Sequence, residues 1–226
     1  IEGLVAIGGD GTFRGAAALD KLGMPTIGIP GTIDNDIPCT RLTIGFDTVV
    51  NTVVDAINKI RDTATSHERI FVIEVMGRNA GFIALAAGLA GGAESILIPE
   101  IPSDVTAVVD NIKRGLARGK RHSIILVAEG VGDVREITEK ITKLSGLETR
   151  LSILGYIQRG GTPTALDRIL ASRMGAEAVK LLLKGQRAKM IGIVGEEIKN
   201  FDLEWALSQK KEIDMDQYNL ARILSI

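Results

Sequence analysis

Two carboxylates separated by one residue could take part in proton transfer. Asp34 and Asp36 lie in segment 30–36, PGTIDND, with a threonine and an asparagine beside them. A hydroxyl group that attacks phosphate needs a positioned carboxylate to take its proton, and a second carboxylate can orient a metal ion. The alternative is a turn whose Asp and Asn side chains bond only their own backbone. The segment alone does not decide between the two.

A glycine-rich segment, residues 8–12 (GGDGT), precedes these carboxylates. Glycines let the backbone approach a phosphate closely, and a following helix offers N–H groups at its start. Asp10 can hold Mg²⁺, which neutralises phosphate charge. An ordinary strand-to-helix turn with an Asp cap is the alternative. It is not a Walker A loop, because G-x-x-x-x-G-K-[ST] is absent. Together with segment 30–36, the glycines favour binding of nucleotide phosphates.

Later segments place charged side chains beside glycine. Arg78, in segment 76–81 (MGRNAG), suits the charge on a transferring phosphoryl group, whereas a solvated arginine would be unfavourable at a helix start. Glu129 suits a sugar hydroxyl, and a simple helix-start charge explains it nearly as well. Arg159 precedes two glycines, and with Arg69 and Arg150 it could grip one phosphate.

A basic cluster, residues 118–122 (RGKRH), lies between a predicted helix and a predicted strand. Its place before a strand puts it at the amino end of the sheet, away from the other segments. A solvated turn is the usual explanation of such a cluster. The alternative is a second anion site, distinct from the first.

Alternating strands and helices must position these side chains. Predicted strands are short apolar runs at 4–7, 26–29, 70–75, 95–98, 123–127, 150–154 and 190–193. Predicted helices lie at 15–22, 43–63, 81–90, 105–118, 134–144, 165–183 and 203–208. This alternation indicates an α/β fold with one or two doubly wound sheets, whose parallel strands have helices on both faces. Ligands bind such sheets at the carboxyl ends of strands, where segments 8–12, 30–36 and 76–81 lie.

Composition excludes several other classes. Lys and Arg number 27 against 28 Asp and Glu, so we expect neither nucleic acid nor a membrane as partner. Cys39 is the single cysteine, which rules out an internal disulfide and a thiolate metal cluster, and we interpret it as a packing residue rather than a nucleophile. Two histidines cannot build a His-rich metal site, so acid–base work falls to carboxylates.

The ends and apolar stretches of the sequence favour a cytoplasmic location. No signal peptide is visible, and the most apolar stretch, residues 82–93, is short and contains three glycines. Ile1 is not an initiator methionine, and residues 3–7 already have the pattern of a buried strand. We therefore expect the chain to lack an N-terminal portion, and it could be inactive alone.

The segments, in this order, resemble the bacterial-type ATP-dependent 6-phosphofructokinases (the phosphofructokinase A family). The similarity runs from about residue 3 to about residue 185 and rests on GGDGT, PGTIDND and MGR. It also rests on GYIQRGG at 155–161 and DRILASR at 167–173. One short motif can occur by chance, but an ordered set of five is specific. The resemblance implies two doubly wound, mainly parallel sheets with helices on both faces.

The resemblance also implies a reaction, the committed step of glycolysis, in which ATP phosphorylates fructose 6-phosphate to fructose 1,6-bisphosphate. Asp34 would be the base on the sugar 1-hydroxyl, with Asp36 supporting it. Thr32 would contact substrate and Arg78 would stabilise the transferring phosphoryl group. Residues implied to hold ATP phosphates are Gly9, Asp10, Gly11 and Thr12, with Asp10 also holding Mg²⁺. Residues implied to bind the sugar phosphate are Met76, Gly77, Glu129, Arg150, Tyr156 and Arg159.

Further implications concern assembly, regulation and domains. Arg69 would reach the site of a neighbouring subunit, so a homotetramer is expected. The allosteric site for ADP or phosphoenolpyruvate would comprise Arg61, Gly92, Glu94, Arg118, Lys120, Arg121 and His122. Residues 1–45 with 159–212 would form a nucleotide-binding domain, 46–158 a sugar-phosphate-binding domain and 213–226 a C-terminal tail.

Three positions bear on the phosphoryl donor and the substrate. Enzymes of this kind that use pyrophosphate have Asp in place of Gly11 and Lys in place of Gly31, so glycine at both favours ATP. Tyr156 stands where many relatives have histidine. Three alternatives stay open: a pyrophosphate-dependent phosphofructokinase, another kinase with a GGDGT turn that acts on NAD or diacylglycerol, and a non-catalytic regulatory subunit that binds a sugar phosphate or nucleotide.

Overall fold

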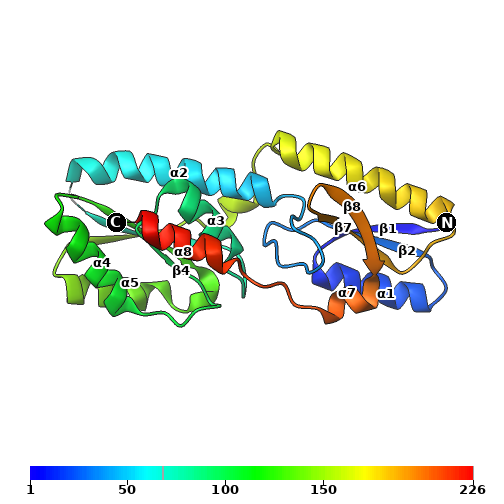
Figure 1. Cartoon of the computed structure of the whole chain (residues 1–226), viewed down its shortest axis with the longest axis horizontal. Coiled ribbons are helices and arrows are strands. Elements are labelled where there is room, and N and C mark those ends of the chain that lie inside the picture. The colour runs from blue at the N-terminus through cyan, green and yellow to red at the C-terminus, as the bar shows by residue number, and fades with distance from the viewer. Residues whose placement is uncertain (68, 226) are drawn as a thin grey trace. The chain divides into compact units, whose positions relative to one another are not determined.

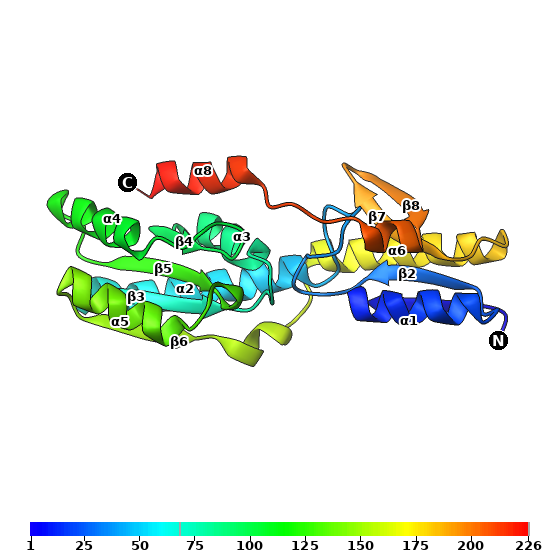
Figure 2. The same cartoon turned by 90° about the horizontal axis from the view of Figure 1, so that it is seen from below.

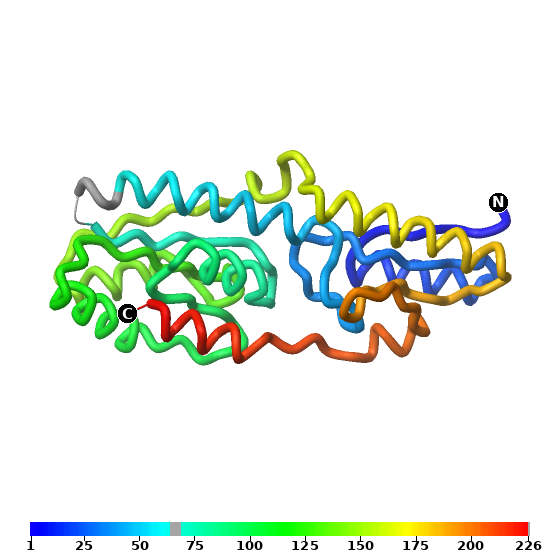
Figure 3. The backbone as a smooth tube through the Cα atoms, turned by 45° about the horizontal axis from the view of Figure 1, so that its top comes forward, coloured from blue at the N-terminus to red at the C-terminus, as the bar shows by residue number. Residues whose placement is uncertain are grey.

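The computed structural model describes the backbone of residues 1–67 and 69–225, which form two compact units. Unit 1 comprises Ile1–Thr48 and Thr162–Glu212, and unit 2 comprises Val49–Gly161 and the residues from Ile213 onward. Each unit is built from two separate stretches of chain, whose colours can be followed in Figure 3. Each contains one four-stranded sheet.

The sheet of unit 1 has the strand order β1-β2-β7-β8. β1 (Leu4–Gly8), β2 (Thr26–Pro30) and β7 (Lys189–Val194) are parallel, and β8 (Glu197–Asp202) pairs with β7 in the antiparallel direction. α6 (Ala165–Leu183) covers one face, and α1 (Asp10–Lys21) with α7 (Leu203–Ser208) covers the other (Figure 1). All five residues of β2 are buried, as expected for a strand covered on both faces.

The sheet of unit 2 is entirely parallel, in the order β4-β5-β3-β6. Its strands are β4 (Ser95–Leu97), β5 (Ser123–Ala128), β3 (Ile70–Val75) and β6 (Thr149–Ile153). α4 (Val105–Ala117) and α5 (Val134–Ser145) cover one face, and α2 (Phe46–His67) and α3 (Phe82–Gly91) cover the other (Figure 1). Short 3₁₀ helices, η1 (Glu129–Val131) and η2 (Gly155–Arg159), follow β5 and β6.

Side-chain caps fix the starts of most helices in both units. The carboxylates of Asp104, Asp133 and Asp202 accept backbone N–H bonds at the first turns of α4, α5 and α7. The Thr164 hydroxyl does the same for α6, and Asp214 caps α8 (Met215–Leu224). Such caps satisfy N–H groups that have no partner within the helix. α1 and α3 have no such cap, because the residues before them are Gly9 and Gly81.

The predicted fold class is confirmed, and all seven predicted strands are present within one residue of their expected bounds. β8 was missed, because its sequence is mostly polar and exposed, as is common in an edge strand. The predicted start of the first helix was wrong: α1 begins at Asp10 rather than at residue 15. Asp10, Gly11 and Thr12 therefore belong to the first turn of α1 and not to a loop before it.

The segment that the sequence analysis assigned to a C-terminal tail forms α8. α8 packs against α3 and β4 in unit 2 (Figure 2). The chain passes between the units after Thr48, Gly161 and Glu212. The first two positions are three residues beyond the expected domain boundaries, and the third is the expected start of the tail. No helix in the part of the chain that the structure describes is long and apolar enough to cross a membrane.

Candidate functional site

In unit 1, the glycine-rich segment and the acidic loop lie side by side at the carboxyl ends of β1 and β2. Gly8 pairs with Pro30 in the parallel register, and the Gly31 N–H donates to the Gly8 carbonyl at 3.0 Å. A Cβ atom at Gly9 would lie 3.8 Å from the Thr32 Cβ. The structure thus confirms the expectation that these two segments share one edge of a sheet.

The first turn of α1 offers backbone N–H groups close to this edge. The first hydrogen bond along the helix runs from the Phe13 N–H to the Gly9 carbonyl, so the N–H groups of residues 10–12 precede the helical ladder. A Cβ at Gly8 would clash with the Thr12 hydroxyl at 2.2 Å, so glycine is required there. Nothing lies within 4 Å of a Cβ built at Gly11. This open, glycine-lined helix start has the form that binds phosphate.

Asp10 and Asp34 differ in their surroundings. The Asp10 side chain is 46% exposed and lies 3.8 Å from the Arg14 guanidinium, one helical turn along. Asp34 is buried, with 6% of its surface exposed, and its carboxylate accepts a 3.3 Å bond from the Thr32 hydroxyl. The Asp34 N–H in turn donates to the Thr32 oxygen at 3.3 Å. Thr32 therefore fixes the direction of the Asp34 carboxylate.

Asn35 organises the rest of the acidic loop. It has a left-handed backbone (φ 52°) and is almost completely buried. Its Oδ1 accepts the Thr43 N–H at 3.0 Å, and its Nδ2 donates to the Arg41 carbonyl at 3.2 Å. Thr43 closes the loop by donating its hydroxyl to the Thr32 carbonyl at 2.6 Å. The loop is thus held by hydrogen bonds among its own residues, and these bonds leave Asp34 compatible with a chemical role.

In unit 2, a second loop is held at the carboxyl ends of β3 and β5. One oxygen of Glu129 accepts the N–H groups of Gly77 (3.2 Å) and Arg78 (2.6 Å). Arg78 is left-handed (φ 53°), and Gly77 has φ 144°, a conformation that side chains rarely adopt. The buried Gln158 accepts the Met76 N–H at 3.1 Å and donates to the Gly155 carbonyl at 3.1 Å. Glu129 and Gln158 therefore shape the backbone that presents the exposed Arg78.

The chain is similar to known proteins of one family. The family model described as Phosphofructokinase matches residues 1–182. The ATP-dependent 6-phosphofructokinase of Brevibacillus brevis is 61% identical over 226 residues, covering all of this chain and 71% of the relative. The enzyme of the same name from Halothermothrix orenii is 60% identical over 239 residues, covering all of this chain and 72% of the relative. The chain belongs to the phosphofructokinase family.

Solved structures agree with this assignment. Phosphofructokinase from Saccharomyces cerevisiae superposes with a TM-score of 0.84 at 31% identity, over 99% of this chain and 33% of the yeast chain. A pyrophosphate-dependent phosphofructokinase from Marinobacter aquaeolei superposes with a TM-score of 0.83 at 26% identity, over 96% of this chain and 62% of that one. The phosphofructokinase fold thus accommodates both phosphoryl donors.

Not all sugar-phosphate residues expected from the phosphofructokinase family meet at the Met76–Arg78 loop. Arg69 precedes β3 and Arg150 lies near the start of β6, so both are at the amino end of the sheet. Both contact Glu148, with Arg69 Nε at 2.9 Å. Arg159 lies over the ring of Tyr156, 5.7 Å from its centroid, and Tyr156 is exposed. The three arginines do not converge within unit 2.

The expected effector residues gather at the amino end of β4 and β5. The Arg61 guanidinium donates to the Gly91 and Gly92 carbonyls, and Lys120 Nζ lies 3.4 Å from the Glu94 carboxylate. Glu94 also accepts the Ile124 N–H at 2.7 Å. The remaining expected residues are on the segment between α4 and β5 that carries Lys120, namely Arg118, Arg121 and His122. The prediction of one local anion site at this edge is compatible with that grouping.

Two residues of unit 1 were given no role of their own in the sequence analysis. Asp167 is buried and accepts the N–H groups of Gly45 and Thr48, both at 2.9 Å, so it anchors the start of α2. Lys211 donates to Asn35 Oδ1 at 2.9 Å. Burial lowers the pKa of Lys211 to about 7, with Arg41 acting in the same direction and Asp36 opposing it. Lysine after a short helix gives no sequence signal, because most such lysines are solvated.

Proposed function

We propose that the protein transfers the terminal phosphoryl group of ATP to the 1-hydroxyl of fructose 6-phosphate, giving fructose 1,6-bisphosphate and ADP. One observation carries the proposal: the buried Asp34 carboxylate, oriented by Thr32, lies in the loop beside the glycine-lined start of α1. A proton acceptor and a phosphate-binding helix start on one sheet edge are the two parts that phosphoryl transfer requires.

In the proposed reaction, Asp34 takes the proton of the sugar hydroxyl as its oxygen attacks the phosphorus. The bond between that phosphorus and the bridging oxygen breaks, and ADP leaves with the bonding electrons. Thr32 holds the carboxylate through its hydroxyl, and Asp36 is the second carboxylate, which supports this base. Arg78 transfers no proton in this scheme. Its guanidinium offsets the charge that develops on the phosphoryl oxygens.

ATP and Mg²⁺ are assigned to the first turn of α1. The backbone N–H groups of Asp10, Gly11 and Thr12 face phosphate oxygens, as helix starts do in other nucleotide sites. The partly exposed Asp10 carboxylate is an oxygen ligand of the kind that Mg²⁺ prefers, and Mg²⁺ is usually held by one or two carboxylates together with the phosphates. When bound, the metal neutralises phosphate charge.

The donor is proposed to be ATP rather than pyrophosphate. The open space at Gly11 leaves room for a nucleotide, and a Cβ at Gly31 would lie 2.9 Å from the Ile7 side chain. The relatives at 60–61% identity are named as ATP-dependent enzymes. These substrates favour the cytoplasm as the location.

The remaining assignments divide the sugar-phosphate and effector residues between subunits. Because Arg69 and Arg150 both contact Glu148 at the sheet edge opposite the Met76–Arg78 loop, we assign both to the sugar-phosphate site of a neighbouring subunit. Met76, Gly77, Glu129, Tyr156 and Arg159 serve the site of their own chain. A homotetramer satisfies this sharing, and the cluster around Lys120 binds the anionic effector.

The test is a coupled assay of the protein in its full natural length with fructose 6-phosphate and either ATP or pyrophosphate. We expect turnover with ATP and about 100-fold less with pyrophosphate. Turnover with pyrophosphate alone would move the protein to the other donor class. Phosphorylation of NAD or of diacylglycerol without turnover of fructose 6-phosphate would reject the proposal, and binding without turnover would indicate a regulatory subunit.

A further inference from the structure

Lys211 reaches the acidic loop from a distant part of the chain. It lies between α7 and α8, within unit 1, and 176 residues separate it from its partner Asn35. Its ammonium donates to Asn35 Oδ1 at 2.9 Å and to the Arg41 carbonyl at 3.2 Å. Asn35 Nδ2 donates to the same carbonyl at 3.2 Å, so the three groups form a closed triangle of hydrogen bonds.

Asn35 is the residue between the two carboxylates of the loop. Its left-handed backbone sets the directions in which the chain carries Asp34 on one side and Asp36 on the other. Left-handed geometry is tolerated by asparagine but is not its preferred state, so it persists when side-chain bonds hold it. The Thr43 N–H and the Lys211 ammonium both hold Oδ1, and Lys211 comes from outside the loop.

The position of Lys211 is costly for a residue with only a packing role. Burial disfavours the ammonium and lowers its pKa, and the nearby Arg41 acts in the same direction. Asp36 is the charged group that opposes this effect. An apolar side chain would avoid the cost, but it could donate no hydrogen bond to Asn35 and would place no positive charge near Asp36. A function in holding the loop explains both features.

We propose that Lys211 is a positioning residue for phosphoryl transfer, which holds Asn35 and so fixes Asp34 at the distance and angle needed to take the substrate proton. The inference rests on the proposed function of the acidic loop. Lys211 touches neither substrate in this scheme and acts through Asn35. Because reactivity depends steeply on alignment, a shift of about 1 Å in the base reduces turnover by about 100-fold.

The test compares Lys211→Met with Lys211→Arg in the full-length protein, with Lys210→Met as the matched control. Lys210 is the exposed neighbour in the same segment. We expect Lys211→Met to lower kcat about 10- to 100-fold with KM for both substrates changed less than about threefold. Lys211→Arg, which keeps the charge and N–H donors, should restore most of kcat. Lys210→Met should behave as the wild type.

Amide hydrogen exchange of residues 32–43 gives a readout that does not depend on activity. Lys211→Met should speed exchange in this segment, while exchange in the sheet of unit 2 stays unchanged. Wild-type kcat and unchanged exchange in Lys211→Met would overturn the inference, as would an equal loss in Lys210→Met. If the wild type itself shows no turnover, the proposed function fails, and the exchange data still decide whether Lys211 holds the loop. If Lys211→Met does not fold, Lys211→Gln takes its place.

Discussion

The acidic loop of unit 1 and the Arg78 loop of unit 2 are built alike but with opposite charges. Each follows a parallel strand and contains a left-handed residue other than glycine, Asn35 (φ 52°) or Arg78 (φ 53°). Each is held by a charged side chain from far along the chain. The holding group is the Lys211 ammonium beside the carboxylates of unit 1, and the Glu129 carboxylate beneath the guanidinium of unit 2.

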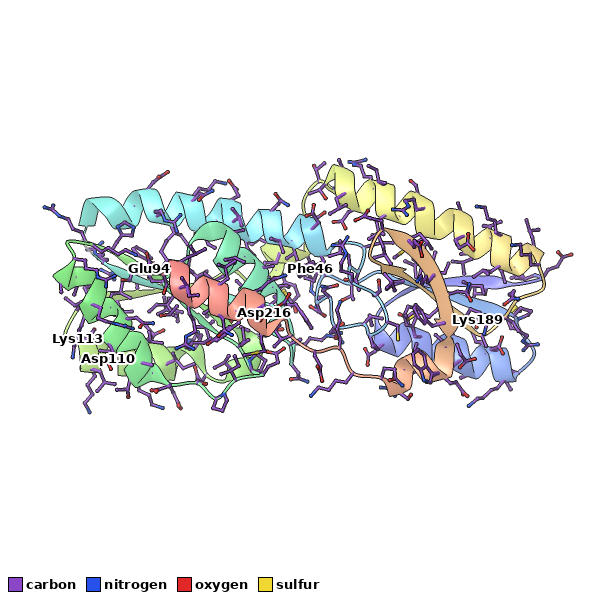
Figure 4. The ribbon with its side chains drawn as sticks, in the orientation of Figure 1. Phe46, Glu94, Asp110, Lys113, Lys189 and Asp216 are labelled. Atoms are coloured by element: carbon purple, nitrogen blue, oxygen red, sulfur yellow. The ribbon has the colours of Figure 1, made fainter. Side chains whose placement is uncertain are left out.

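This difference indicates how a strained loop can present a charged side chain. The holding group is opposite in charge to the side chain that the loop presents, so it stabilises the backbone and compensates part of the presented charge. Figure 4 shows the side chains of both units in the orientation of Figure 1, with Phe46 labelled at the start of α2. The two loops should therefore respond differently when a presented charge or a holding charge is removed.

Removal of the presented carboxylate should have the largest effect. Asp34→Asn keeps the shape and the bond from Thr32 but can no longer take a proton, so we expect kcat to fall by about 10⁴-fold with little change in KM. Steady-state kinetics with ATP and fructose 6-phosphate measure this. Asp55→Asn, at an exposed ion pair on α2, is the control and should leave kcat unchanged. Undiminished kcat in Asp34→Asn would remove the base from the mechanism.

Removal of the presented guanidinium in unit 2 should cost less. Arg78→Ala deletes a charge that stabilises the transition state without moving a proton, and we expect kcat to fall by about 10²- to 10³-fold. Arg78→Lys should recover part of this loss, because it restores the charge but not the planar fork. Arg114→Ala, an exposed arginine on α4, serves as the control. A loss confined to KM would make Arg78 a binding residue only.

The presented side chains were predictable from sequence, and most of the holding groups were not. Arg78 directly follows Gly77, and Asp34 stands three residues after Gly31, each near the end of an apolar strand. Such a pattern is visible within one segment. Lys211 and Asp167 act on residues 176 and 119 to 122 positions away, and no local pattern encodes such pairings. Glu129 was identified as a sugar ligand, whereas its visible bonds are to the loop backbone. Likewise, the strands were found from their apolar runs, but polar β8 was not.

The charge of the holding group in unit 1 should appear in the pH dependence of stability. The pKa of Lys211 is lowered to about 7 in the folded protein from 10.5, so above pH 7 the unfolded chain binds more protons at this site. Stability therefore rises with pH through this window, by at most about 1.4 kcal/mol per pH unit, and the burial cost is fully present below pH 7. Denaturant unfolding of wild type and Lys211→Met between pH 7 and 9 measures this.

The quantity that tests this prediction is the difference in free energy of unfolding between the wild type and Lys211→Met. The free energy of unfolding of the wild type should gain on that of Lys211→Met as pH rises, whereas Lys210→Met should run parallel to the wild type. A difference that stays constant from pH 7 to 9 would show that the ammonium is not desolvated. The Lys211 ammonium would then hold the acidic loop without the cost of burial.

Removal of the charge of Glu74, a carboxylate close to the Glu129 holding group, should give the smallest effect. Burial raises the pKa of Glu74, in β3, and the neighbouring carboxylates of Glu129 and Asp133 raise it further, while Arg135 opposes them. Below the ordinary pKa of 4.5 both states are protonated and there is no penalty; as pH rises through the raised folded pKa, the ionised carboxylate costs stability. Glu74→Gln should therefore raise Tm by about 1–3 °C at pH 7.5, and the gain should vanish at pH 4. Glu139→Gln, on the exposed side of α5, should leave Tm unchanged at both pH values. A Glu74→Gln variant with lower Tm at pH 7.5 would mean that the ionised Glu74 carboxylate stabilises the protein, which would contradict the prediction.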